Sequence, residues 1–195
     1  MVASTEQGGT RERILEVALD LFGHHGYEGT SIRDVAERMG LTKAAVYYHF
    51  PSKESLLADV LTPAMTRVRR VLAETGPVTT PEQRRRLVTA LVDVAGEVGP
   101  QVVVLLSDPA VGSHLRELVG DSPLPQQVGE ALIGPVPDDP AAAARAQIRA
   151  ACAVGCLPTG IDAWRRANPT RATLDDEAKA VLAEAVLAVV ESGSD

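Results

Sequence analysis

The apolar residues of this chain recur at helical spacing along nearly its whole length. In the stretch RERILEVALDLFGHHG they fall three or four positions apart, which gathers them on one face of an amphipathic helix. The same spacing continues through residues 53–73 and 173–191, and no segment has the period-two alternation of a half-buried strand. The sequence therefore predicts an all-α protein.

Residues that favour helix ends divide the first part of the chain into short helices. A first helix ends near Gly26, and Thr30 or Ser31 can cap a second helix that runs through Met39 and stops at Gly40. Ser31 followed by Asp34 resembles a capping box, with Asp in place of the usual Glu or Gln. Thr42 can cap a third helix over residues 43–49, which must end before Pro51, because a residue that precedes proline is pushed out of helical geometry. These signals predict three short helices in succession.

A longer helix is expected from Ser52 into the low seventies, with a kink or a local break near Pro63. The stretch GPVTTP at 76–81 is a break in composition and marks a domain boundary. We expect an N-terminal domain over 10–52, a connecting helix over 53–75 and a second domain over 76–195. Helices in the second domain are expected at about 81–98, 100–107, 109–119, 123–133, 140–156 with a continuation to 167 past Pro158, and 173–191.

Aromatic and basic residues concentrate in the N-terminal part. The chain has six Phe, Trp and Tyr residues, and five of them precede position 51. A net charge of −7 argues against a surface coated in positive charge, but residues 31–53 hold four basic and two acidic residues. The stretch GLTKAAVYYHFPSK at 40–53 is therefore a candidate contact surface, unless its aromatic residues merely pack in a small core.

Spacing sorts the side chains of the third helix into an inner and an outer set. Val46 and Phe50 face inward, whereas Lys43, Tyr47 and Tyr48 lie on outward faces. Three such helices with a glycine turn form a helix-turn-helix, which presents one helix to the DNA major groove. Cationic and hydroxyl side chains there can donate to bases and phosphates, and alanines permit close approach. The predicted DNA-contacting residues are Thr30, Ser31, Arg33, Thr42, Lys43, Ala44, Ala45, Tyr47, Tyr48, His49 and Lys53.

The stretch TSIRDVAERMGLTKAAVYYHFPSKESLL resembles the DNA-binding signature of the TetR family of one-component transcriptional regulators. The matching positions are Phe22, Gly26, Tyr27, Thr30, Gly40, Tyr47, Phe50 and Lys53. The resemblance covers about residues 10–60, and beyond residue 75 only length and helical character match. It implies a homodimeric regulator, most often a repressor, that binds a palindromic DNA operator and responds to a small effector bound in its second domain.

The expected effector region, 81–133, is mostly aliphatic. Its few polar groups and weak positive charge favour an apolar or weakly cationic small molecule, although a filled hydrophobic core is an equal alternative. The candidate effector-binding residues are Gln101, Leu105, Asp108, His114 and Gln127.

The last helix has a periodic Ala/Val/Leu stripe that suits either a core or a dimer seam. Since a helix-turn-helix of this type reads two half-sites, we favour the dimer seam for this helix. The resemblance to the TetR family implies a homodimer formed through the last two long helices. The candidate interface residues are Cys152, Cys156, Trp164, Val181, Leu182, Ala185 and Val189.

Other functional classes have less support. His24, His25 and His49 lack partners at metal-ligand spacing, no GxSxG nucleophile motif is present, and we expect no metal, cofactor or enzymatic activity. The alternatives are an enzyme, or a sequence-independent architectural protein, that uses the helix-turn-helix for targeting. MVASTEQGG lacks the features of a secretory signal and VVVLL at 102–106 is too short to cross a membrane, so we expect a cytoplasmic protein without a membrane partner.

Overall fold

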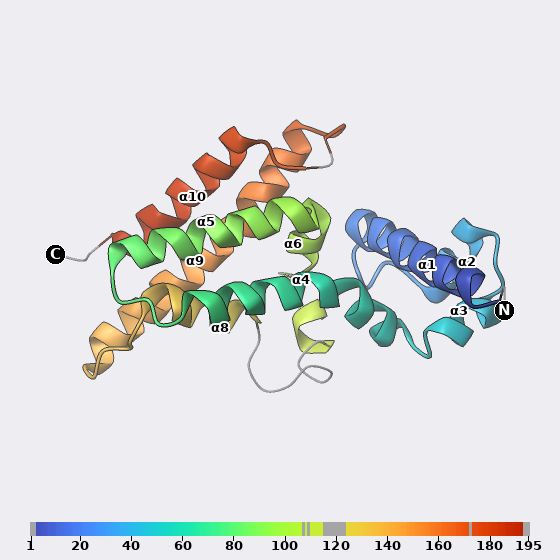
Figure 1. Ribbon diagram of the computed structural model, residues 1–195, viewed down its shortest axis with the longest axis horizontal. Coiled ribbons are helices and arrows are strands. Elements are labelled where there is room, and N and C mark those ends of the chain that lie inside the picture. Colours follow the sequence, from blue (N-terminus) through green and yellow to red (C-terminus); the bar gives the residue numbers. More distant parts are fainter. Residues whose placement is uncertain (1–2, 107, 109, 115–123, 172, 193–195) are drawn as a thin grey trace.

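Helices build the whole described part of the chain, which comprises residues 3–106, 108, 110–114, 124–171 and 173–192 of a computed structural model (Figure 1). The first four are α1 (Ala3–His25), α2 (Ile32–Met39), α3 (Lys43–His49) and α4 (Lys53–Thr75). They are followed by α5 (Pro81–Val98), α6 (Pro100–Leu106), α8 (Leu124–Ile133), α9 (Pro140–Ala167) and α10 (Asp176–Glu191). Of the helix expected over 109–119, residues 110–114 are described, and they are helical. The all-α prediction is confirmed, since none of the described residues forms a strand.

The molecule is elongated, with its short helices at one end. Figure 1 shows α1, α2 and α3 together at that end, while α5, α8, α9 and α10 form the larger body at the other. Helix α4 begins beside α3 and continues into the larger body. This arrangement joins the two ends through a continuous helical element.

Side-chain caps set where α2 and α3 begin. The Ser31 hydroxyl accepts the Asp34 N–H, and the Asp34 carboxylate in turn accepts the Ser31 N–H at 2.7 Å, so the two residues form a capping box. These hydrogen bonds from Ser31 hold the pKa of Asp34 below its usual value. Gly40 ends α2 at φ 66°, a left-handed conformation that costs glycine little, and Thr42 caps α3 by accepting the Ala45 N–H.

The inner face of α3 is held in a core that it shares with α1 and α4. Val46 and Phe50 are completely buried and Phe22 of α1 is 2% exposed, as the spacing predicted. Tyr27 lies beside Phe22 with the two ring centroids 5.4 Å apart. Burying side chains of this size contributes roughly 1.5–3 kcal/mol each, so rotating α3 would expose several such contributions to water.

Helix α4 is unbroken across Pro63, so the local break that the sequence allowed does not occur. Pro63 is exposed, and the missing N–H leaves the carbonyl of Asp59 without its helical donor on the outside of the helix. Farther along α4, Val68 and Leu72 pack against both hydrophobic cores. Helix α4 therefore links the packing of the two ends.

The core of the larger body is built from α5, α8, α9 and α10. Leu87, Leu132 and Ile161 are completely buried in it, and Val186 of α10 is 1% exposed. Helix α9 runs through Pro158 to Ala167, as expected, whereas α10 begins at Asp176 instead of residue 173. The later start has a local cause, because Asp175 caps the helix by accepting the N–H of Ala178.

The C-terminal end of α1 contacts three elements of the larger body. A β-carbon on Gly23 would lie 3.0 Å from the Gln101 Cγ of α6, so the absence of a side chain at this position permits the close approach. Arg165 of α9 donates to the Gly23 carbonyl oxygen at 3.3 Å. The His114 ring packs against Tyr27, with 5.1 Å between their centroids. The two ends of the molecule are thus joined at α1 as well as through α4.

Hydropathy identifies no single membrane-spanning helix within the described ranges. Only α5 and α6 taken together have the necessary length and apolar character, and that pair is bent by 113°.

Tyr27 supplies a test of the packing between α1 and its surroundings. Its ring is buried, its hydroxyl finds no hydrogen-bond partner among the described residues, and burial raises its pKa to about 12. Because an unpaired buried hydroxyl is costly, Tyr27→Phe should raise the free energy of unfolding by about 1 kcal/mol in denaturant titrations. Tyr48→Phe, at an exposed position, should change it by less than about 0.5 kcal/mol. A destabilised Tyr27→Phe variant would contradict this account.

Candidate nucleic-acid interface and ligand cavity

The outer face of α3 is a compact set of exposed polar and aromatic side chains. Tyr48 is 75% exposed and Tyr47 is 41% exposed, although large aromatic side chains are usually buried. Lys43 and Ala44, in the first turn of the same helix, are also exposed. The fully buried Val46 prevents α3 from turning these side chains inward.

Contacts within this face hold its aromatic groups in place. The Lys43 Nζ lies 5.5 Å from the centroid of the Tyr47 ring, within the range of a cation–π interaction. Tyr48 and His49 meet edge to face with 5.2 Å between ring centroids. The face therefore presents one ammonium group and two phenolic hydroxyls on a short rigid helix, donors that suit base edges and phosphate oxygens.

Several predicted contact residues at the edge of this face also stabilise the local structure. Ser31 and Thr42 cap α2 and α3, and the Nε of Arg33 donates to Glu37 at 2.7 Å. All three are exposed beside α3. Ala45 is half-buried, and its backbone N–H is used by the Thr42 cap.

Thr30 does not belong to the exposed face, which corrects the sequence prediction. It is 3% exposed, and its hydroxyl donates to the carbonyl oxygens of Gly26 at 3.0 Å and Leu21 at 3.2 Å. Thr30 thus hydrogen-bonds to one carbonyl group in the last turns of α1 and to another just beyond its end. Its role is to stabilise the turn before α2.

Lys53 lies at the first position of α4 and is half-buried. Its Nζ is 4.0 Å from the centroid of the Tyr27 ring, so its stem is packed while its charge stays near the N-terminus of the helix. The next residue, Glu54, has a lowered pKa, chiefly because the Ser52 side chain hydrogen-bonds to it.

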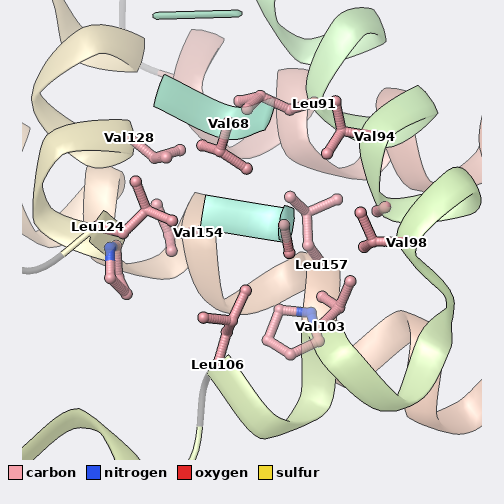
Figure 2. A pocket seen from close by; sticks show the side chains of 14 residues that line it. Val68, Leu91, Val94, Val98, Val103, Leu106, Leu124, Val128, Val154 and Leu157 are labelled. Carbon is pink, nitrogen blue, oxygen red and sulfur yellow. The ribbon is translucent and has the colours of Figure 1, made fainter. Parts of the chain in front are cut away.

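An apolar cavity of about 90 Å³, partly open to solvent, lies in the larger body, where five helices meet. Figure 2 shows side chains of α4, α5, α6, α8 and α9 surrounding it, with Val68 and Leu91 on one side and Val103 and Leu106 on the other. All of its described lining residues are apolar. They are Ala64, Val68, Leu91, Val94, Ala95, Val98, Val103, Leu106, Leu124, Pro125, Val128, Val154, Leu157 and Pro158.

Metal binding has no support from the geometry. Among the described residues, no three His, Cys, Asp or Glu side chains come together in an arrangement that could hold a metal ion.

Comparison with known proteins connects the exposed α3 face with a family. Residues 14–60 match the family model "Bacterial regulatory proteins, tetR family". The HTH-type transcriptional repressor AcnR of Corynebacterium diphtheriae is 37% identical over 78 residues, which are 40% of this chain and 41% of AcnR. The TetR family transcriptional regulator PfmR from Thermus thermophilus has a crystal structure that covers 91% of this chain and 97% of its own, with a TM-score of 0.60 at 26% identity.

The chain is thus similar to the tetR family of bacterial regulatory proteins over residues 14–60. Its sequence match spans about two fifths of the length of the AcnR relatives, and it lies over the helix-turn-helix. A more distant structure, Bacillus subtilis FadR in complex with stearoyl-CoA, has a TM-score of 0.60 at 14% identity and covers 94% of this chain and 99% of that one. At that identity the likeness concerns the fold alone.

The five residues predicted to bind an effector are absent from the described lining of the cavity. Gln101 packs on Gly23, Leu105 is 4% exposed in the core near α1, and Asp108 accepts the N–H of Ala110. His114 lies 3.6 Å from the Glu28 carboxylate and against Tyr27, and Gln127 is half-buried outside the cavity wall. The prediction favoured polar groups, whereas the cavity wall is aliphatic.

The predicted interface residues divide between the surface and the subunit core. Cys152, Val181 and Ala185 are exposed on α9 and α10. Leu182 is 6% exposed and packs toward Gly160, where a β-carbon would lie 2.5 Å from its Cδ2, so its assignment to a seam between copies is wrong. Cys156, Trp164 and Val189 are partly buried against the same core.

A Lys43→Ala variant can show whether Lys43 contacts a base or a phosphate. If Lys43 reads a base, Lys43→Ala should weaken specific binding by about 1–3 kcal/mol and leave non-specific binding little changed in gel-shift titrations. A uniform loss with a salt slope reduced by about one would instead identify a phosphate contact. Arg70→Ala is the matched control, because Arg70 is exposed on α4 and pairs with Glu74. If the Lys43→Ala variant binds DNA as tightly as the wild type, the proposal that α3 contacts DNA is wrong.

Proposed function

We propose that this chain is a sequence-specific DNA-binding transcriptional regulator, a ligand-responsive repressor that acts as a homodimer on a palindromic operator. The observation that carries the proposal is the outer face of α3, where Lys43, Tyr47 and Tyr48 are exposed on a helix anchored by buried Val46 and Phe50. The family match over residues 14–60 supports DNA as the partner. A regulator of this kind must reach the chromosome, so we expect it to work in the cytoplasm.

The dimer is supported by an apolar outer face on α9 and α10. Ile148 of α9 is 64% exposed and Val181 of α10 is 60% exposed, whereas most of the other large aliphatic residues on these helices pack inside the subunit. The small residues Gly155 and Ala185 are exposed on the same two helices, and small residues permit close helix packing. A second copy seated on this face would bury it and place two α3 helices for half-sites about 34–36 Å apart.

Selection of bound DNA from a random library tests both parts of the proposal. The full chain should recover a palindrome whose half-sites lie one helical turn, about 10 base pairs, or a multiple of it apart. Val181→Glu should give a monomer in sedimentation and weaken binding to that palindrome by on the order of 100-fold or more, because a buried unpaired carboxylate costs about 3 kcal/mol.

The control for that variant is Val136→Glu, which changes a 49% exposed valine outside both helices and should leave both measurements unchanged. A dimeric Val181→Glu variant with undiminished operator affinity would overturn the proposed seam. Binding without sequence preference would favour the architectural alternative instead.

The ligand response is supported by the position of the cavity relative to α1 and α4. Helix α4 contributes Ala64 and Val68 to the cavity wall, and its first turns pack in the core beneath α3. Helices α6 and α9 also line the cavity, and through Gln101 and Arg165 they contact Gly23 of α1. A ligand that widens this cavity must shift these helices, so the protein has one conformation before the shift and another after it. The largest change in operator affinity that the ligand can cause is set by the difference between its own affinities for these two conformations.

Arg165 allows this mechanical connection to be tested. Arg165→Met removes the donor to Gly23, so hydrogen exchange should become faster for the amides of residues 21–30 and stay unchanged at the Ser31 capping box. Arg166→Met is the control, because Arg166 pairs with the same Asp162, whereas the hydrogen bond to Gly23 comes from Arg165. Equal exchange in the wild type and in both variants would mean that Arg165 does not hold α1.

A further inference from the structure

The wall of the cavity has a defect in its helical hydrogen bonding at Pro158. Pro158 lies inside α9 and has no N–H, so the carbonyl of Val154, four residues earlier, lacks its helical donor. Val154, Leu157 and Pro158 all line the cavity, which places this part of α9 with its proline side toward the empty space. In Figure 2, Val154 and Leu157 both extend toward that space.

The Val154 carbonyl belongs to a residue of a cavity wall whose described side chains are all apolar. Pro125 also lines the cavity, but it is the second residue of α8, so no carbonyl of that helix precedes it by four residues. Pro63 does leave a carbonyl without a helical donor, but Pro63 is exposed and does not line the cavity. Only at Pro158, among the described prolines, do a helical defect and the cavity coincide.

We propose that the cavity binds an uncharged aliphatic molecule with one hydrogen-bond donor, a hydroxyl or an amide N–H, which donates to the carbonyl oxygen of Val154. An apolar wall excludes charged groups, because their desolvation in the cavity has no compensation. A carbonyl in apolar surroundings is costly without a donor, so a ligand that supplies one gains more than a ligand that fills the same space without it. This inference rests on the ligand response proposed above and names its chemical class.

The size of the cavity restricts the ligand further. About 90 Å³ is small beside the roughly 300–1,000 Å³ of typical ligand pockets, so the chain must be short or must push the walls apart. We therefore choose six-carbon probes of nearly equal volume. They are 1-hexanol, its isomer methyl pentyl ether, hexylammonium and hexanoate.

The test compares dissociation constants of these probes for the full chain by ligand-observed NMR titration. For the wild type, 1-hexanol should bind about 2- to 10-fold more tightly than methyl pentyl ether, the effect of one neutral hydrogen bond. It should also bind more tightly than hexylammonium or hexanoate. In Pro158→Ala, the new N–H bonds to Val154 within the helix, so the ratio between alcohol and ether should fall to about one.

Pro125→Ala is the matched control, because it removes the same ring from the same cavity wall without supplying a donor to Val154. It should keep the preference for the alcohol over the ether. Equal binding of the two isomers to the wild type, a preference that survives in Pro158→Ala, tighter binding of either ion, or no binding of any probe would each overturn the inference.

These outcomes are separate from those of the operator selection. The chain could select a palindrome and yet bind the alcohol and the ether equally. That result would support the proposed regulator and contradict only the proposed ligand class. The chain could instead prefer the alcohol and yet select no DNA sequence. That result would contradict the proposed regulator and support the proposed ligand site.

Discussion

Helix α4 must satisfy two hydrophobic cores at once, and most other features of the structure depend on that constraint. Leu56, Leu57 and Leu61 are completely buried in the core that anchors α3, while Val68 and Leu72 contact both cores. A helix of 23 residues packed at both ends transmits displacement with little loss, because packed interiors are dense and resist compression. Helix α4 therefore contributes both to the wall of the cavity and to the core that supports α3.

The helix-turn-helix could be predicted from the sequence because its determinants are local. The Ser31 capping box, the left-handed Gly40 and the Thr42 cap act within four residues, so short sequence patterns contain them. The three-or-four spacing likewise assigned Val46 and Phe50 to the core. For Thr30 the pattern was insufficient, because burial of its hydroxyl depends on carbonyl groups of α1 up to nine residues earlier.

The cavity and the outer face of the larger body could not be predicted in the same way. An apolar stripe identifies the buried side of a helix but not the helix that covers it, so Leu182 and Val181 looked equivalent in the sequence. The structure buries the first inside the subunit and leaves the second at 60% exposure. The cavity wall combines residues from 64 to 158, and this combination depends on how five helices meet. The one local signal was Pro158, whose effect on the Val154 carbonyl matters only because the cavity adjoins it.

The hydrogen bond from Arg165 to Gly23 joins residues 142 positions apart in the chain. During synthesis, domains generally fold as units, with the N-terminal one first. Helices α1 to α4 are complete long before Arg165 leaves the ribosome, so α3 acquires most of its supporting core while the carbonyl of Gly23 still faces water. The nascent protein therefore has a recognition helix before it has the contact that would restrain it. The contact from Arg165 thus forms later in synthesis than the helices that surround α3.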